Sequence, residues 1–184
     1  MQTWCILSIL LITFPADVSG QQVLYTSKAG GVSFRSDAQL ELISAKSKHL
    51  GGVVNPATKG VAFSVPINTF AGFNSAVQLE HFTENYLEVT KFAVATFTGK
   101  IIEHVDFGVT GTNDIRVKGI LNIHGVSKER IIPGTIIISG NTAHMLASFT
   151  VPLSEHGITV PKLLSQKIAE VISVHIDILL EKTE

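Results

Sequence analysis

The chain has 184 residues, of which 45% are hydrophobic and 16% charged, and its formal net charge is −1. A chain of this length and composition can bury one sizeable core, so it fits one domain better than two. Its near-neutral charge offers no field that would steer nucleic acid to the surface, so we expect no nucleic-acid partner.

The start of the chain has the pattern of a secretory signal peptide. Its apolar run, residues 4–14, is far shorter than the roughly 20 residues needed to span a bilayer, and small residues lead up to Gly20. We predict cleavage near Gly20. This would leave a domain of residues 21–184, without a transmembrane segment, in the periplasm or otherwise exported. Cys5 is the only cysteine and leaves with the signal peptide, so packing rather than disulfides must stabilise the mature domain.

Eight segments after the signal peptide alternate apolar and polar residues with a period of two, which is typical of half-buried strands. They are residues 32–36, 39–45, 61–67, 92–102, 115–123, 131–138, 144–152 and 171–180. Turns rather than regular helices separate most of them, which favours an antiparallel sheet closed on itself. The sequence therefore predicts a mainly β fold, a single antiparallel barrel of about eight strands with one or two short helices.

Two segments break the alternation, and we expect both to be helical. The first, residues 74–89, has Asn74 or Ser75 as a suitable N-cap. The second, residues 161–171, begins with Pro161, which suits the first position of a helix.

Two of the predicted strands indicate which side chains face the interior. One face of the first holds Ala93, Ala95, Phe97, Gly99 and Ile101, and one face of the second holds Ala143, Met145, Ala147, Phe149 and Val151. Because successive side chains of a strand point to opposite faces, we predict that these residues share one apolar interior. Small residues between large ones can leave room for a ligand or accommodate a bulky neighbour. This pattern alone therefore leaves both a ligand cavity and a fully packed core open.

Four stretches of the chain resemble the YceI-like protein family. In YTSKAGGVSFRS an aromatic residue is followed by a Gly-x-x-x-Phe-x-Ser pattern, as at the start of that family. The stretch FSVPINTFAGFNSAVQLEHFTENYLEVTKFAVATFTGKI resembles its strand, helical segment and following strand. VKGILNIHGVSKE is similar to its hairpin, with Ser127 where Thr is usual, and HGITVPKLLSQKIAEVISVHIDILL is similar to its closing helix and strand.

The resemblance spans residues 25–180 and implies a lipocalin-like antiparallel barrel. It further implies that the interior binds a long isoprenoid or a similar amphipathic lipid, in the periplasm. Ala29-Gly30 and Val77-Gln78 stand near the places where many family members carry a His-Ser and an Arg-Asp pair. These departures point to a divergent branch with a different head group or a filled cavity.

The sequence offers no pattern that would support catalysis or metal binding. It has no His-x-His, no His-Glu-x-x-His and no Gly-x-Ser-x-Gly. His81 beside Glu80, and His104 near Glu103, have carboxylate neighbours suited to acid or base chemistry, but a nucleophile is missing. We therefore expect a protein that is not an enzyme and that has no cofactor and no metal site.

Two functional hypotheses follow. In the first, the protein binds, carries or sequesters a polyisoprenoid, quinone-like or fatty-acyl lipid inside the barrel. In the second, a filled barrel serves as a protein-interaction module of the cell envelope. An empty apolar cavity would favour the first, and a packed interior with an exposed apolar patch the second. The oligomeric state stays open, with a homodimer as one option.

The first hypothesis has a definite set of candidate lipid-binding residues. Seven are predicted to line the interior: Ala95, Phe97, Ile101, Leu121, Met145, Ala147 and Phe149. Phe82 and Tyr86 are predicted to lie near its entrance, where the hydroxyl of Tyr86 adds a hydrogen-bonding group to an apolar ring.

Overall fold

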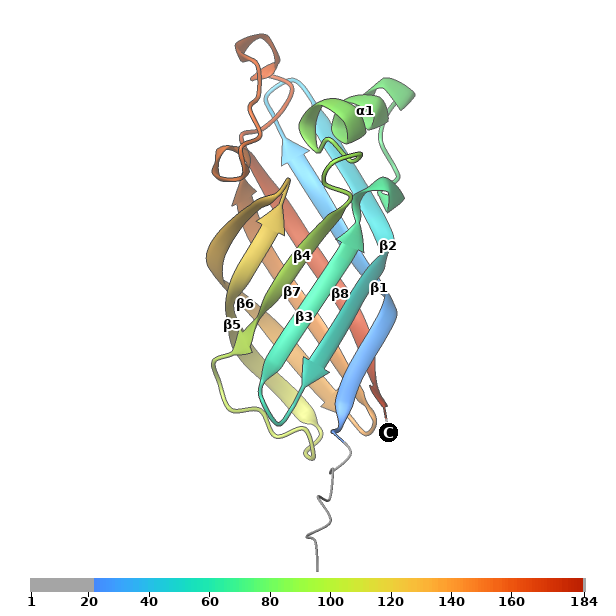
Figure 1. Ribbon diagram of the computed structural model, residues 1–184, viewed down its shortest axis with the longest axis vertical. Helices are drawn as coiled ribbons and strands as arrows, with labels where there is room; N and C mark the ends of the chain where they lie inside the picture. Colours follow the sequence, from blue (N-terminus) through green and yellow to red (C-terminus); the bar gives the residue numbers. More distant parts are fainter. Residues whose placement is uncertain (1–21, 184) are drawn as a thin grey trace, which may run out of the picture.

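The computed structural model describes residues 22–183, so the predicted signal peptide and its cleavage site near Gly20 lie outside the described residues. Eight strands form one closed antiparallel barrel, in which each strand pairs with the next and β8 pairs with β1 (Figure 1). The strands are β1 (Leu24–Asp37), β2 (Leu42–Asn55), β3 (Gly60–Pro66), β4 (Val94–Ile101), β5 (Gly111–Ile123), β6 (Val126–Ser139), β7 (Thr142–Pro152) and β8 (Val171–Thr183). The predicted fold class is confirmed.

The two ends of the elongated barrel differ (Figure 1). Most of the short helices gather at one end, which we call the mouth: α1 (Ala76–Glu80), the π-helix η2 (His81–Tyr86) and the segment of residues 153–170. The opposite end, which we call the closed end, carries the β2–β3 and β6–β7 turns and the C-terminus.

The interior near the closed end is filled by branched side chains. Ile136, Ile138, Ile178 and Leu180 are at most 1% exposed. Gly30 makes this packing possible, because an added Cβ would lie 2.5 Å from Cγ1 of Ile178. Branched side chains in such close contact make a dry, well-packed core.

Strands β1 and β2 are longer than the predicted segments 32–36 and 39–45. β1 changes register around Gly30, and β2 continues past residue 45 to Asn55. Glycines and polar residues interrupt the apolar alternation in these parts, so a search for period-two alternation stops too early.

The first predicted helical segment is confirmed. α1 begins after Ser75, whose Oγ accepts a hydrogen bond from the N–H of Gln78 at 3.2 Å, and it continues directly into η2. Ser75 thus caps the helix in the expected way.

The prediction of a second helix, over residues 161–171, is wrong. Only a 3₁₀ turn, η4 (Lys162–Leu164), follows Pro161. The N–H of Ala169 donates to the hydroxyl of Ser36 at 2.9 Å. A backbone N–H that would donate to a carbonyl within a helix therefore donates to β1 instead.

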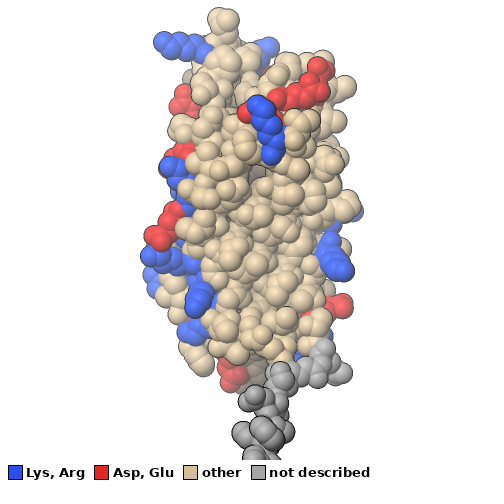
Figure 2. All heavy atoms as spheres, viewed as in Figure 1, with Lys and Arg blue, Asp and Glu red and all other residues tan. Residues whose placement is uncertain are grey.

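Charged side chains are unevenly distributed over the surface. On the face shown in Figure 2, Lys, Arg, Asp and Glu lie mainly at the sides and ends, and the middle is uncharged.

Within residues 22–183, none of the helices has the length and apolar character needed to cross a membrane.

Candidate functional site

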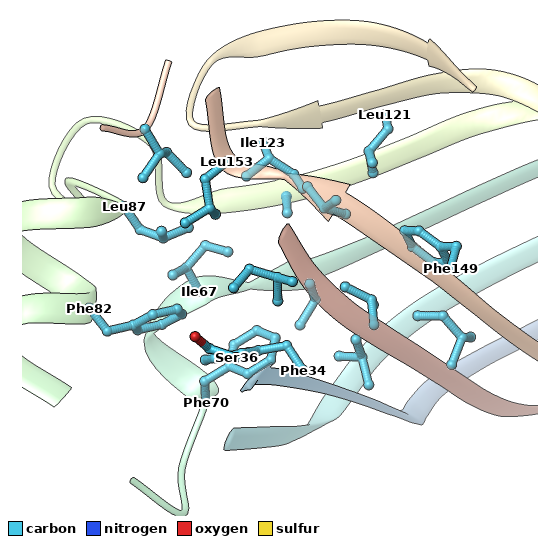
Figure 3. Close-up of a pocket in the computed structure, with 18 of the residues that line it drawn as sticks. Phe34, Ser36, Ile67, Phe70, Phe82, Leu87, Leu121, Ile123, Phe149 and Leu153 are labelled. Atoms are coloured by element: carbon cyan, nitrogen blue, oxygen red, sulfur yellow. The ribbon is translucent and has the colours of Figure 1, made fainter. Parts of the chain in front are cut away.

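The mouth half of the barrel encloses a cavity of about 460 Å³, lined almost entirely by apolar side chains (Figure 3). All eight strands contribute to its wall. Binding pockets for small ligands typically measure about 300–1,000 Å³. The interior is therefore hollow at one end and packed at the other.

The structure places eight of the nine predicted site residues on the cavity wall. They are Ala95, Phe97, Leu121, Met145, Ala147, Phe149, Phe82 and Tyr86. The predicted interior face of β4 and β7 is confirmed, because Phe97, Met145, Ala147 and Phe149 all line the same space. Their role in binding a lipid stays a prediction.

Ile101 is the exception among the predicted site residues. It is 3% exposed but does not line the cavity, so its placement on the cavity wall is corrected. The reason is its position at the last residue of β4, towards the closed end. There the ring of Phe97 already lies against Gly119, where an added Cβ would be 2.8 Å from Cζ of Phe97.

An aromatic cluster covers the mouth. The ring of Phe82 stacks on Phe34 with centroids 5.2 Å apart and an interplanar angle of 15°. It also contacts Phe73, at 5.0 Å, and Phe70, at 5.8 Å. Phe82 thus attaches η2 to β1 and to the chain that follows β3, as Figure 3 shows for Phe34, Phe70 and Phe82. Such pairs stabilise beyond the burial of their area.

Polar side chains form part of the cavity rim. Glu41, Gln78, His81 and Lys167 line it there with Tyr86. The side-chain amide of Gln78 donates to the carboxylate of Glu41. Burial raises the pKa of the Tyr86 phenol, which keeps its hydroxyl protonated and able to donate. The cavity is thus apolar inside with hydrogen-bonding groups at its opening.

Sequence reasoning did not identify Glu41 or Phe34 as part of this site. Phe34 lies on the same predicted strand face as Val32 and Ser36, so the period-two pattern was sufficient to find it. Glu41 reaches Gln78 across 37 positions of sequence, and a local pattern contains no information on such a contact.

Two histidines attach the helical cover to the barrel. Nε2 of His124, in the β5–β6 turn, lies 2.9 Å from Oε2 of Glu88, two residues after η2. Nδ1 of His124 lies 3.2 Å from the carbonyl oxygen of His156. His156 is fully buried, donates from Nδ1 to the carbonyl of Val126 at 3.0 Å, and has its pKa lowered by burial. Hydrogen bonds from Lys91 and His124 lower the pKa of Glu88.

Other polar pairs lie on the outer surface of the barrel. Ser148 and His175 are 2.8 Å apart between side chains exposed on the outer face of β7 and β8. The carboxylate of Glu103 binds Arg116 at 2.7 Å. Among residues 22–183, no group of three or more His, Cys, Asp or Glu side chains is arranged to hold a metal ion.

Fold and cavity together define a class: a small antiparallel barrel with an apolar pocket under a helical cover. The model of the YceI-like domain matches residues 14–180, and the chain belongs to this family. A search of curated protein sequences gives no match.

Solved structures share this fold at low sequence identity. The polyisoprenoid binding domain from Saccharophagus degradans, implicated in plant cell wall breakdown, is 14% identical with a TM-score of 0.73, over 89% of this chain and all of that one. BcnA from Burkholderia cenocepacia is 15% identical with a TM-score of 0.68, over 82% of this chain and 95% of that one. The YceI protein of Campylobacter jejuni is 13% identical with a TM-score of 0.55, over the whole of both chains.

Proposed function

We propose that this protein binds and carries, or sequesters, a long-chain amphipathic lipid with its tail inside the barrel. The observation that carries this proposal is the cavity of about 460 Å³, almost entirely apolar inside, with hydrogen-bonding groups at its rim. The similar fold of a polyisoprenoid binding domain supports a prenyl chain as one candidate, beside quinone-like and fatty-acyl chains. The open cavity favours a carrier over a filled barrel that acts only as an interaction module.

The energetics favour recognition of the tail over the head group. Each buried methylene contributes about 0.8 kcal/mol, so roughly ten of them can offset much of the cost of association without a strong polar contact. Affinity should therefore increase up to about fourfold for each added methylene until the cavity is full.

We also propose that the protein acts in the periplasm or otherwise outside the cytoplasm. The support is the sequence pattern that ends near Gly20. N-terminal sequencing of the protein from an envelope fraction should give a start near Gln21. A start at Met1 in the folded protein would contradict export by cleavage.

The lipid is best identified by mass spectrometry of the protein purified from its native envelope, followed by titration with prenyl and acyl chains of graded length. Ala147→Trp adds bulk inside the cavity and should abolish binding while the barrel stays folded. Thr98→Trp adds the same bulk on the outer face of β4 and should bind normally. If the unmodified protein takes up no chain of any length, the carrier function is refuted. Normal binding by folded Ala147→Trp would show that the cavity is not the site.

A further inference from the structure

The barrel wall is interrupted between β6 and β7 on the side of the mouth. The β6–β7 ladder ends at Gly134↔Ala147. β6 nevertheless stays paired with β5 almost throughout, and β7 stays paired with β8 throughout. Within the described chain, residues 129–133 of β6 and 148–152 of β7 therefore face each other without a backbone ladder.

Pro133 explains where the ladder ends. Its partner on β5, Arg116, points both backbone groups away from β6: its N–H donates to Oε2 of Glu103 at 2.6 Å, and its carbonyl accepts from the N–H of Ile102 at 2.8 Å. Arg116↔Pro133 is therefore not a hydrogen-bonded pair, and the nitrogen of Pro133 faces β7. A proline nitrogen has no hydrogen to donate, so the ladder cannot continue regularly past Gly134.

Side-chain contacts close the gap again nearer the mouth. Nη2 of Arg130 donates to Oε2 of Glu155 at 2.6 Å, and Nδ1 of His156 donates to the carbonyl of Val126 at 3.0 Å. The unladdered part from Arg130 to Gly134 covers four residue-to-residue steps along the strand, or about 13 Å. We call this part the side slot.

The cavity and an outer groove share part of their walls at the end of the side slot that is farther from the mouth. Both are lined by Ile115, Pro133, Gly134, Leu146 and Ala147. The groove additionally has polar walls, formed by Glu103, Asp114, Arg116, Thr135 and Ser148. The apolar cavity and the polar groove thus lie on either side of the wall where the β6–β7 ladder ends: Gly134 and Ala147 form its last pair, and the side slot begins at Pro133.

We infer that the side slot is a lateral portal through which the amphipathic ligand enters and leaves, with its tail passing between β6 and β7 and its head group in the outer groove. This inference rests on the proposed lipid binding. Widening the mouth by moving the helical cover would require Phe82 to leave three aromatic rings and Glu88 to leave His124. Passage through the side slot crosses no paired ladder.

The first test closes the side slot by restoring the missing donor. Pro133→Val returns an N–H directed at β7 and a side chain suited to a strand. The probe is cis-parinaric acid, a fluorescent fatty acid, and its transfer to and from phosphatidylcholine vesicles is followed by stopped-flow fluorescence. We expect loading and release both to slow by about tenfold or more, because the closed slot must open before the chain can pass. Pro56→Val, in the turn between β2 and β3, is the matched control and should exchange at the unmodified rate.

A second test leaves Pro133 in place. Ile131→Cys and Thr150→Cys put two outward-facing thiols on opposite sides of the side slot, and a short bismaleimide joins them. Cross-linking should slow exchange by about tenfold or more in the same protein. The control pair, Thr98→Cys with Ile120→Cys, lies across the intact β4–β5 ladder and should have no effect when cross-linked.

The outcomes separate two failures. If the unmodified protein loads no parinaric acid and no prenyl chain, the proposed lipid binding is refuted. If it loads the probe but both slot-closed proteins exchange at the unmodified rate, the ligand uses the mouth and the lateral portal is refuted. If Pro133→Val does not fold, the cross-linked pair decides the question alone.

Discussion

The two halves of the barrel interior have the same alternating pattern of apolar residues, but one half is packed and the other is hollow. Near the closed end, Ile178 and its neighbours are fully buried against one another. Two residues earlier on the same face of β8, Ile176 lines the cavity. Side-chain alternation therefore decides which residues face inward. Whether they fill the space depends on how closely the strands approach one another and on what covers the end of the barrel.

The largest effect should come from Ile178→Ala. Ile178 is fully buried and touches Gly30, so its truncation leaves a cavity that rigid strands cannot collapse. We expect the free energy of unfolding to fall by about 4 kcal/mol in urea titrations, within the range for buried Ile→Ala changes. Ile176→Ala, the matched change in the hollow half, should cost clearly less. Equal losses for the two variants would mean that the interior is uniformly packed.

A smaller effect is expected for Phe149→Ala. A Phe→Ala change in a packed core costs about 3–5 kcal/mol. Phe149 is half-buried and borders the cavity, so we expect a loss of about 2 kcal/mol in the same titrations. A loss at the upper end of the core range would show that Phe149 belongs to the packed half.

A still smaller effect should be confined to the mouth. Ser75→Ala removes the N-cap of α1 and should destabilise that helix by about 1 kcal/mol. Hydrogen exchange of the amides in α1 and η2 should accelerate, while the amides of β8 stay protected. Equal acceleration in β8 would mean that the helical cover and the barrel unfold as one unit.

The smallest effect should be a dependence of stability on pH near neutrality. Burial lowers the pKa of His156 in the folded protein, so below the ordinary pKa of about 6.5 the unfolded chain binds the proton more readily. The contribution of neutral His156 to the free energy of unfolding is fully present above about pH 6.5. It is lost as the pH falls towards the pKa of His156 in the folded protein. Urea titrations at pH 7.5 and 5.5 should show a lower free energy of unfolding at the acidic pH. His156→Gln should reduce this difference, whereas His49→Gln, at an exposed position, should not.

Much of the barrel was predictable because side-chain alternation is a local property. The inward positions of Phe97 and Met145 follow from the period of two alone. The long β1 and β2 were not predictable in this way, because their inward positions include Gly30 and Ser47 rather than large apolar residues.

The candidate site was predictable only in part. Its wall follows from the strand faces, but the pairing of Glu41 with Gln78 and the fold of residues 161–171 depend on contacts between distant segments. The side slot was also predictable only in part. Pro133 is visible in the sequence, but only the pairing of Arg116 shows which neighbouring strand loses a donor.

The pairing of β1 with β8 has a kinetic consequence. Thr26 is opposite Glu181, so the wall becomes complete only when the first and last strands of the barrel meet. Pairings between such distant segments form slowly, because the entropy of closing the intervening loop must be overcome first. A chain that has not yet placed β8 has no pocket in which to hold a hydrophobic tail. Binding of the proposed lipid would then require β8 to be in place, and a bound lipid would favour the closed barrel by mass action.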